Sequence, residues 1–148
     1  MNIKIDKLDL NEQNLLNLSR IKSLTNLKHN NHVCRWALVV SLLINNSPPP
    51  ITRKNNDDIP SIDWHVFGGK NEGLYLSLLR MRLKKNKIEE TKNNLETELA
   101  KHVTRGLSIM AANKRIGYKV YKHPELADYS MRNCHLLFNE YLGKNLAK

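Results

Sequence analysis

Residues 30–50 read NNHVCRWALVVSLLINNSPPP, and this stretch decides the fold. Nearly every side chain from 33 to 44 is apolar, so a helix here is apolar all round and must be covered by neighbours on several sides. Asn30 or Asn31 is a suitable N-cap for it. The three prolines at 48–50 end it, because proline lacks the backbone donor and clashes with a helical turn. We therefore predict that this helix is the central element of the fold.

The residues around it predict further elements. Residues 1–10 alternate loosely and indicate a short strand or an extended arm. Asp9 and Glu12 have the spacing of a capping box, so a helix is expected to begin there and to run to about Leu24. The polar, proline-bearing stretch from 46 to 63 predicts a long surface loop. Further helices are expected over about residues 71–85, 87–112 and 124–141.

The later helices carry apolar stripes at helical spacing. The apolar stripe of the helix over 71–85 consists of Leu74, Leu78 and Met81, together with Tyr75 and Leu79. In the helix over 87–112, Gly106 lies within the stripe and costs about 1 kcal/mol relative to alanine, which a close helix crossing would justify. The prediction is an all-α fold, a compact helical domain of four to five helices to which residues 1–10 can add a short extended strand. Residues 1–148 are expected to form a single domain.

The composition is basic. The chain has 148 residues with 24 Lys and Arg against 14 Asp and Glu, a net charge of +10. Residues 73–122 hold twelve basic and four acidic side chains, so +8 of the +10 lies there. Such a balance favours a nucleic-acid partner. No apolar stretch reaches the roughly 18 residues of a membrane helix, so no membrane partner is expected. Two cysteines are too few for a disulfide framework, which favours a cytoplasmic protein.

The basic side chains are the best candidates for a binding site. They predict contacts to the phosphate backbone of DNA that are salt-dependent and need no sequence readout. Some of the positive charge at the end of the helix over 71–85 is also an ordinary partner of the helix dipole. The predicted DNA-binding residues are Arg20, Lys22, Arg80, Arg82, Lys84, Lys85, Lys87, Lys101, Arg105, Lys114 and Arg115.

Patterns that suggest metal or nucleophilic chemistry are incomplete. His29-x-x-His32-x-Cys34 invites a metal interpretation, but residues two apart on a helix point about 200° away from each other. No second cluster with zinc spacing completes the set. Cys34 is more simply a small core residue, and Cys134-His135 lacks a third partner. We expect no metal and no cofactor.

Carboxylates suggest a hydrolytic site only weakly. Asp57, Asp58, Asp63 and His65 lie close together in the sequence, and Glu90-x-Lys92 matches the tail of a PD-(D/E)xK nuclease pattern. That pattern needs a central sheet, whereas Glu89 and Glu90 here suit a solvated helix N-terminus. We expect no catalytic residue.

Four segments, in order, resemble the DNA sulfur modification protein family DndE over about residues 3–112. They are His32-Val33-Cys34-Arg35-Trp36-Ala37-Leu38, then Phe67-Gly68-Gly69, then Tyr75-Leu76-Ser77-Leu78-Leu79, then His102-Val103-Thr104-Arg105-Gly106-Leu107. The resemblance implies a small all-α protein that belongs to a DNA phosphorothioation system and lacks a catalytic centre. It also implies an oligomer, specifically a tetramer, that binds duplex or nicked DNA beside a cysteine desulfurase and an ATP-using sulfur-transfer protein. Residues from about 113 to 148 extend past the similar part.

Two other interpretations stay open. A ribbon-helix-helix-like repressor would use a strand near Ile3 to Leu8, paired across a dimer, to contact the major groove. Asp6 is a poor residue for that groove. A nicking or sulfur-transfer enzyme would need the carboxylates at 57, 58 and 63, His65 or one of the two cysteines.

Overall fold

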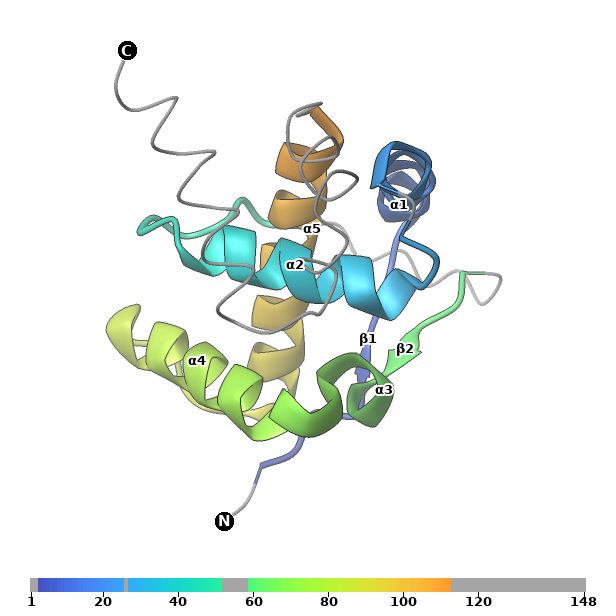
Figure 1. Cartoon of the computed structure of the whole chain (residues 1–148). Helices are drawn as coiled ribbons and strands as arrows, with labels where there is room; N and C mark the ends of the chain where they lie inside the picture. Colours follow the sequence, from blue (N-terminus) through green and yellow to red (C-terminus); the bar gives the residue numbers. More distant parts are fainter. Residues whose placement is uncertain (1–2, 26, 52–58, 113–148) are drawn as a thin grey trace.

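The structure is a computed structural model that describes residues 3–25, 27–51 and 59–112. Its centre is helix α2 (Asn30–Leu42), which packs against the longest helix, α5 (Lys92–Ala112) (Figure 1). Every residue from Val33 to Ser41 except Arg35 is buried, as expected of a helix that is apolar all round. The prediction of an all-α fold around a central helix is confirmed.

The two central helices cross at Gly106. A Cβ atom there would lie 2.6 Å from Ala37 Cα and closer still to the carbonyl group of Ala37. The backbones of α2 and α5 therefore touch at this point, which explains the glycine in the apolar stripe. The other predicted members of that stripe are also buried: Leu95, Leu99, Val103 and Met110.

Helix α1 (Glu12–Thr25) packs against α5 and buries Leu18 and Ile21. The predicted cap was displaced by two residues. Asn11 Oδ1 accepts from Asn14 N at 2.8 Å, and Asn14 Oδ1 accepts from Asn11 N at 3.0 Å. This reciprocal pair does the work expected of Asp9 and Glu12, because an asparagine oxygen can accept from the free amides of the first turn as a carboxylate can.

The N-terminal segment forms a strand, and its partner lies in the region predicted to be loop. Strand β1 (Lys7–Leu8) pairs antiparallel with β2 (Ile62–Asp63). Helix α3 (Trp64–Gly68) follows directly, and Asp63 caps it by accepting from His65 N at 2.9 Å. The rings of Trp64 and Phe67, both in α3, stack with their centroids 5.5 Å apart. A 3-10 turn, η1 (Gly69–Asn71), then leads into helix α4, and φ of Gly69 is +53°, so the glycine permits the turn.

Helix α4 (Glu72–Lys85) has the expected range, but only part of its predicted apolar stripe faces the core. Tyr75, Leu79 and Leu83 are buried, whereas Leu74 is 44% exposed and Met81 is 66% exposed. The helix carries two apolar stripes, and spacing alone does not tell which one faces the core.

Two helix boundaries also differ from the prediction. Helix α2 ends at Leu42, before the three prolines, because arginines from α4 and α5 bind its last carbonyls. Helix α5 begins at Lys92 rather than near Lys87, because Lys87 has φ of +57° and Thr91 Oγ1 accepts from Asn94 N at 3.1 Å.

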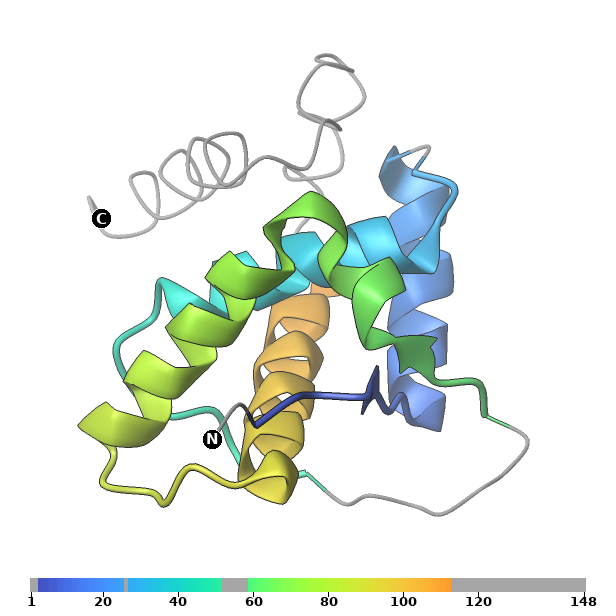
Figure 2. The ribbon, with the colours of Figure 1, turned by 90° about the horizontal axis from the view of Figure 1, so that it is seen from below.

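Helices α1 and α4 lie on opposite sides of the α2–α5 pair, and a second view confirms this arrangement (Figure 2). This separation decides which basic residues can share a surface. The predicted helix over 124–141 lies outside the described residues. None of the helices over 3–25, 27–51 and 59–112 has the length and apolar character needed to cross a membrane.

Candidate nucleic-acid interface

Two of the predicted DNA-binding arginines bind the C-terminal end of α2. Arg105 Nη2 donates to Ser41 O at 2.8 Å, and Arg105 Nη1 donates to Asn46 O at 3.0 Å. Arg82 Nη2 donates to Leu42 O, and Arg82 Nη1 lies 3.4 Å from Asn45 O. The last carbonyls of a helix have no partner within the helix, so these cations satisfy them and also meet the negative end of the dipole.

Arg105 also begins a buried chain of hydrogen bonds. Its Nε donates to Ser41 Oγ at 2.8 Å, and Ser41 Oγ lies 2.8 Å from His102 Nδ1. His102 Nε2 lies 3.0 Å from Glu98 Oε1. Arg105 Nε can only donate to Ser41 Oγ, so the serine hydroxyl donates its own proton to His102 Nδ1. A neutral His102 then carries its proton on Nε2 and donates it to Glu98.

The two titratable groups of this chain have shifted pKa values. Burial lowers the pKa of His102, and this effect outweighs the hydrogen bond to Glu98. Burial alone would raise the pKa of Glu98, but the His102 hydrogen bond, with the charges of Lys101 and Arg82, holds it below its usual value. Ser41, His102 and Glu98 are all at most 2% exposed. The group therefore joins α2 to α5 and has no access to a substrate.

Arg80 and Lys101 are also engaged within the chain. Arg80 pairs with Glu90, and Lys101 Nζ lies 3.8 Å from Glu98 Oε2. Together with Arg82 and Arg105, four of the predicted DNA-binding residues thus have a role in holding the fold. Lys114 and Arg115 lie outside the described residues.

Three of the predicted DNA-binding residues are exposed lysines at the end of α4. Lys84, Lys85 and Lys87 are exposed, and the described part of the chain gives none of them an ion pair. Lys84 and Lys85 lie in the last turn of the helix, and Lys87 lies two residues after its end. We call these three residues the α4 lysine cluster.

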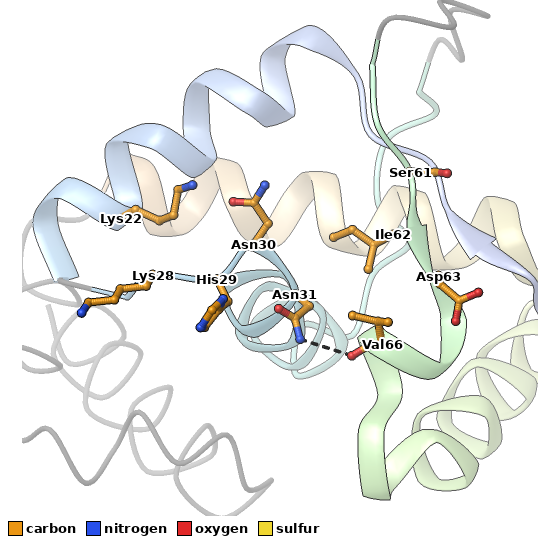
Figure 3. Close-up of a pocket in the computed structure, with 9 residues that line it drawn as sticks. All are labelled: Lys22, Lys28, His29, Asn30, Asn31, Ser61, Ile62, Asp63 and Val66. Atoms are coloured by element: carbon orange, nitrogen blue, oxygen red, sulfur yellow. Dashed lines mark hydrogen bonds between the residues drawn. The ribbon is translucent and has the colours of Figure 1, made fainter.

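The remaining predicted residues, Arg20 and Lys22, lie at the end of α1. Lys22 lines a groove of about 420 Å³ between this end, the start of α2, and β2 with α3 (Figure 3). Its amine is directed toward Asn30, whereas Lys28 points away from the groove. Asn31 Nδ2 donates to Val66 O at 3.2 Å across the groove. Lys28 adds a cation here that the sequence reasoning missed, although its place in a turn between two helices was a signal of exposure.

The basic residues therefore form two separate groups. The α4 lysine cluster and the α1 end lie on opposite sides of the α2–α5 pair, as Figure 1 and Figure 2 show for their helices. Arg20 and Lys22 do not extend the surface at the end of α4.

The structure describes some of the residues that the alternative interpretations need. Cys34 is fully buried, and burial raises the pKa of its thiol to about 12, so it is a poor nucleophile. His65 Nδ1 lies 2.7 Å from Glu72 Oε2, and this hydrogen bond raises the pKa of His65. Lys92 pairs with Asp6. Asp57, Asp58 and Cys134 lie outside the described residues.

The strand of the repressor interpretation is already paired. Because β1 bonds to β2 of the same chain, it is not free to pair across a dimer in the manner of a ribbon-helix-helix protein. Within residues 3–25, 27–51 and 59–112, no group of three or more His, Cys, Asp and Glu side chains could hold a metal ion.

These observations define a class: a small helical protein with two separate basic surfaces around a buried helix pair. The family model described as DNA sulphur modification protein DndE matches residues 7–117, so the chain belongs to the DndE family. No curated protein matches the chain significantly. Membership confirms the resemblance of the four sequence segments and gives the chain a role in DNA sulfur modification.

Proposed function

We propose that the chain is a DNA-binding, non-catalytic subunit of a DNA phosphorothioation system. It contacts the phosphate backbone of duplex or nicked DNA and acts as a homo-oligomer, a tetramer by resemblance, beside the other proteins of the system. The observation that carries the proposal is the α4 lysine cluster, three exposed cations without an ion pair among the described residues, in a chain of net charge +10. Free lysines lose little when they bind phosphates, because no internal partner is given up.

The groove at the end of α1 supports a second contact of the same kind. Arg20, Lys22 and Lys28 bring positive charge to the other side of the protein. A DNA strand that reached both groups would have to pass around the protein or contact two copies of an oligomer. The two groups are therefore best tested by separate variants.

The test is fluorescence anisotropy with intact and nicked 30-base-pair duplexes at several salt concentrations. The Lys84→Gln/Lys85→Gln/Lys87→Gln variant is expected to bind more weakly. The slope of log affinity against log salt should fall by up to about 2.7, from about 0.9 for each phosphate contact. The matched control removes three exposed lysines that belong to neither group: Lys4→Gln/Lys7→Gln/Lys70→Gln.

The variants avoid Arg80 and Arg82, because both bind partners within the chain and their loss would confuse unfolding with lost contact. An Arg20→Gln/Lys22→Gln variant measures the α1 end. Unchanged affinity and salt slope in the α4 variant would contradict the assignment, as would an equal loss in the control.

A further inference from the structure

Helix α4 has an apolar face that the described chain leaves uncovered. Leu74, Leu78 and Met81 follow each other at i, i+4 and i+7 and so lie along one side of the helix. Leu74 is 44% exposed, Met81 is 66% exposed, and Leu78 is partly buried. The core is contacted by a different stripe, Tyr75, Leu79 and Leu83. A helix that only covers a core needs one apolar stripe, so the second stripe calls for another partner.

Two small residues, Gly73 and Ser77, lie beside this stripe on α4. A Cβ atom on Gly73 would meet nothing within 4 Å, and one turn later Ser77 Oγ donates to Gly73 O at 2.9 Å. The serine hydroxyl is therefore satisfied by its own helix. Small residues next to a ridge of larger ones allow the axis of another helix to approach closely, at about 8–10 Å.

The charge around the stripe is positive at one end. Lys84 and Lys85 follow Met81 within the last turn of α4. Two acids near the ends of α4 are already engaged, since Glu72 pairs with His65 and Glu90 pairs with Arg80. A partner that covers the stripe must bring acidic side chains to this end, because uncompensated lysines beside it would repel a basic partner.

We propose that the outer face of α4 docks an acidic amphipathic helix of another protein. Its apolar residues lie on Leu74, Leu78 and Met81, and its carboxylates lie beside Lys84 and Lys85. The proposal does not rest on DNA binding by this chain. Where both hold, carboxylates and phosphates compete for the same lysines, and the partner helix displaces DNA from the end of α4.

The probe is a fluorescein-labelled 18-residue peptide with leucine at i, i+4 and i+7 spacing and glutamate at the flanking positions. Its companion carries lysine in place of glutamate. The full chain is expected to bind the acidic peptide at least tenfold more tightly than the basic one, as measured by anisotropy. Leu74→Ser/Met81→Ser should weaken binding at least tenfold. Leu16→Ser is the matched control, because Leu16 on α1 is also 66% exposed, and it should leave binding unchanged.

Further measurements separate the possible outcomes. Lys84→Gln/Lys85→Gln should weaken binding of the acidic peptide and reduce its salt dependence, whereas Leu74→Ser/Met81→Ser should leave DNA affinity unchanged. Circular dichroism checks that each variant is folded, and Met81→Ser alone replaces the double variant if that one unfolds. The proposal is overturned if the acidic peptide does not bind, or if it binds the stripe variant as tightly as wild type.

Two other occupants would also overturn it. The first is a second copy of this chain. Sedimentation velocity would then show an oligomer in the wild-type protein that is lost in Leu74→Ser/Met81→Ser, and the acidic peptide would not bind. The second is a lipid surface. The wild-type chain would then bind vesicles of phosphatidylglycerol and phosphatidylcholine, Leu74→Ser/Met81→Ser would not, and the acidic peptide would not bind.

Discussion

The contact between α2 and α5 at Gly106 predicts a large loss of stability in Gly106→Ala. The added methyl group would lie 2.6 Å from Ala37 Cα and closer to the carbonyl carbon and oxygen of Ala37, which are backbone atoms that cannot rotate away. The helices must separate to accommodate it. Overpacking costs typically about 1–3 kcal/mol, and the crossing lies at the centre of the fold, so the upper end applies. Alanine returns about 1 kcal/mol of helix propensity. We therefore expect a net loss of about 2 kcal/mol.

Urea unfolding followed by circular dichroism measures this loss as a change in the free energy of unfolding. Gly73→Ala is the matched control, because it places the same methyl group in a helix where nothing lies within 4 Å. This control should gain up to about 1 kcal/mol. If Gly106→Ala were as stable as wild type, or more stable, the backbone contact at the crossing would be refuted.

Three more predictions follow from the same geometry. Arg105→Gln removes donors from Ser41 O and Ser41 Oγ and should lower the free energy of unfolding by about 2 kcal/mol in urea titrations, against less than about 0.5 for Lys84→Gln. The lowered pKa of His102 favours its neutral form in the folded state, so its contribution to stability is present above pH 6.5 and falls as the pH drops below that value. The urea midpoint should therefore fall from pH 7 to pH 5, and it should fall less in His102→Gln; His65, whose pKa is raised, works in the opposite direction and is common to both proteins. With its pKa raised to about 12, Cys34 should resist iodoacetamide at pH 8 in the folded protein and react in 8 M urea, as peptide mass spectrometry would read; modification at equal rates in both would contradict its burial.

The central helix could be predicted from the sequence because its pattern allows one outcome. A run that is apolar on every side is stable only when it is surrounded, so the burial of α2 followed from its residues. Gly106 was also informative, since a glycine within an apolar stripe needs a reason and a close crossing supplies one. In both cases the local sequence pattern is compatible with only one kind of packing: a surrounded helix in the first case and a close helix crossing in the second.

The outer helix was harder because its pattern allows two solutions. Leu74, Leu78 and Met81 lie at i, i+4 and i+7, and Tyr75, Leu79 and Leu83 lie at i, i+4 and i+8, so both sets have the helical spacing of a face that packs on a core. Only the position of α2 and α5 selects the second set. The strand pair was hidden for a similar reason, since each strand has two residues and their register depends on a partner more than fifty residues away.

The binding site was harder to predict for a different reason. The sequence shows which residues are charged, but it does not show which internal groups bind them. Arg82 and Arg105 look like surface cations, yet the free carbonyls at the end of α2 bind them. Lys84 and Lys85 have the same formal charge and stay exposed. The guanidinium group suits buried carbonyls because it presents several donors in a rigid plane, whereas an ammonium group on a flexible stem is readily left in water. Among the described residues of this basic segment, Arg80, Arg82 and Arg105 bind partners within the chain, whereas the lysines divide: the α4 lysine cluster stays exposed and Lys101 pairs with Glu98.

The same division between internally bound and exposed residues applies to the segments that resemble the DndE family. The segments that resemble the DndE family contain Arg35, Arg105 and Gly106, and each of these holds helices together: Arg35 binds the carbonyls of Val66 and Phe67, Arg105 binds the end of α2, and Gly106 permits the crossing. The similar segments thus preserve the helix arrangement. The groups available to a partner, the α4 lysine cluster and the exposed Leu74 and Met81, lie outside these segments, so exchanging them changes binding with little cost to the fold. Substitutions at the first set are therefore expected to act through stability, and substitutions at the second set through binding alone.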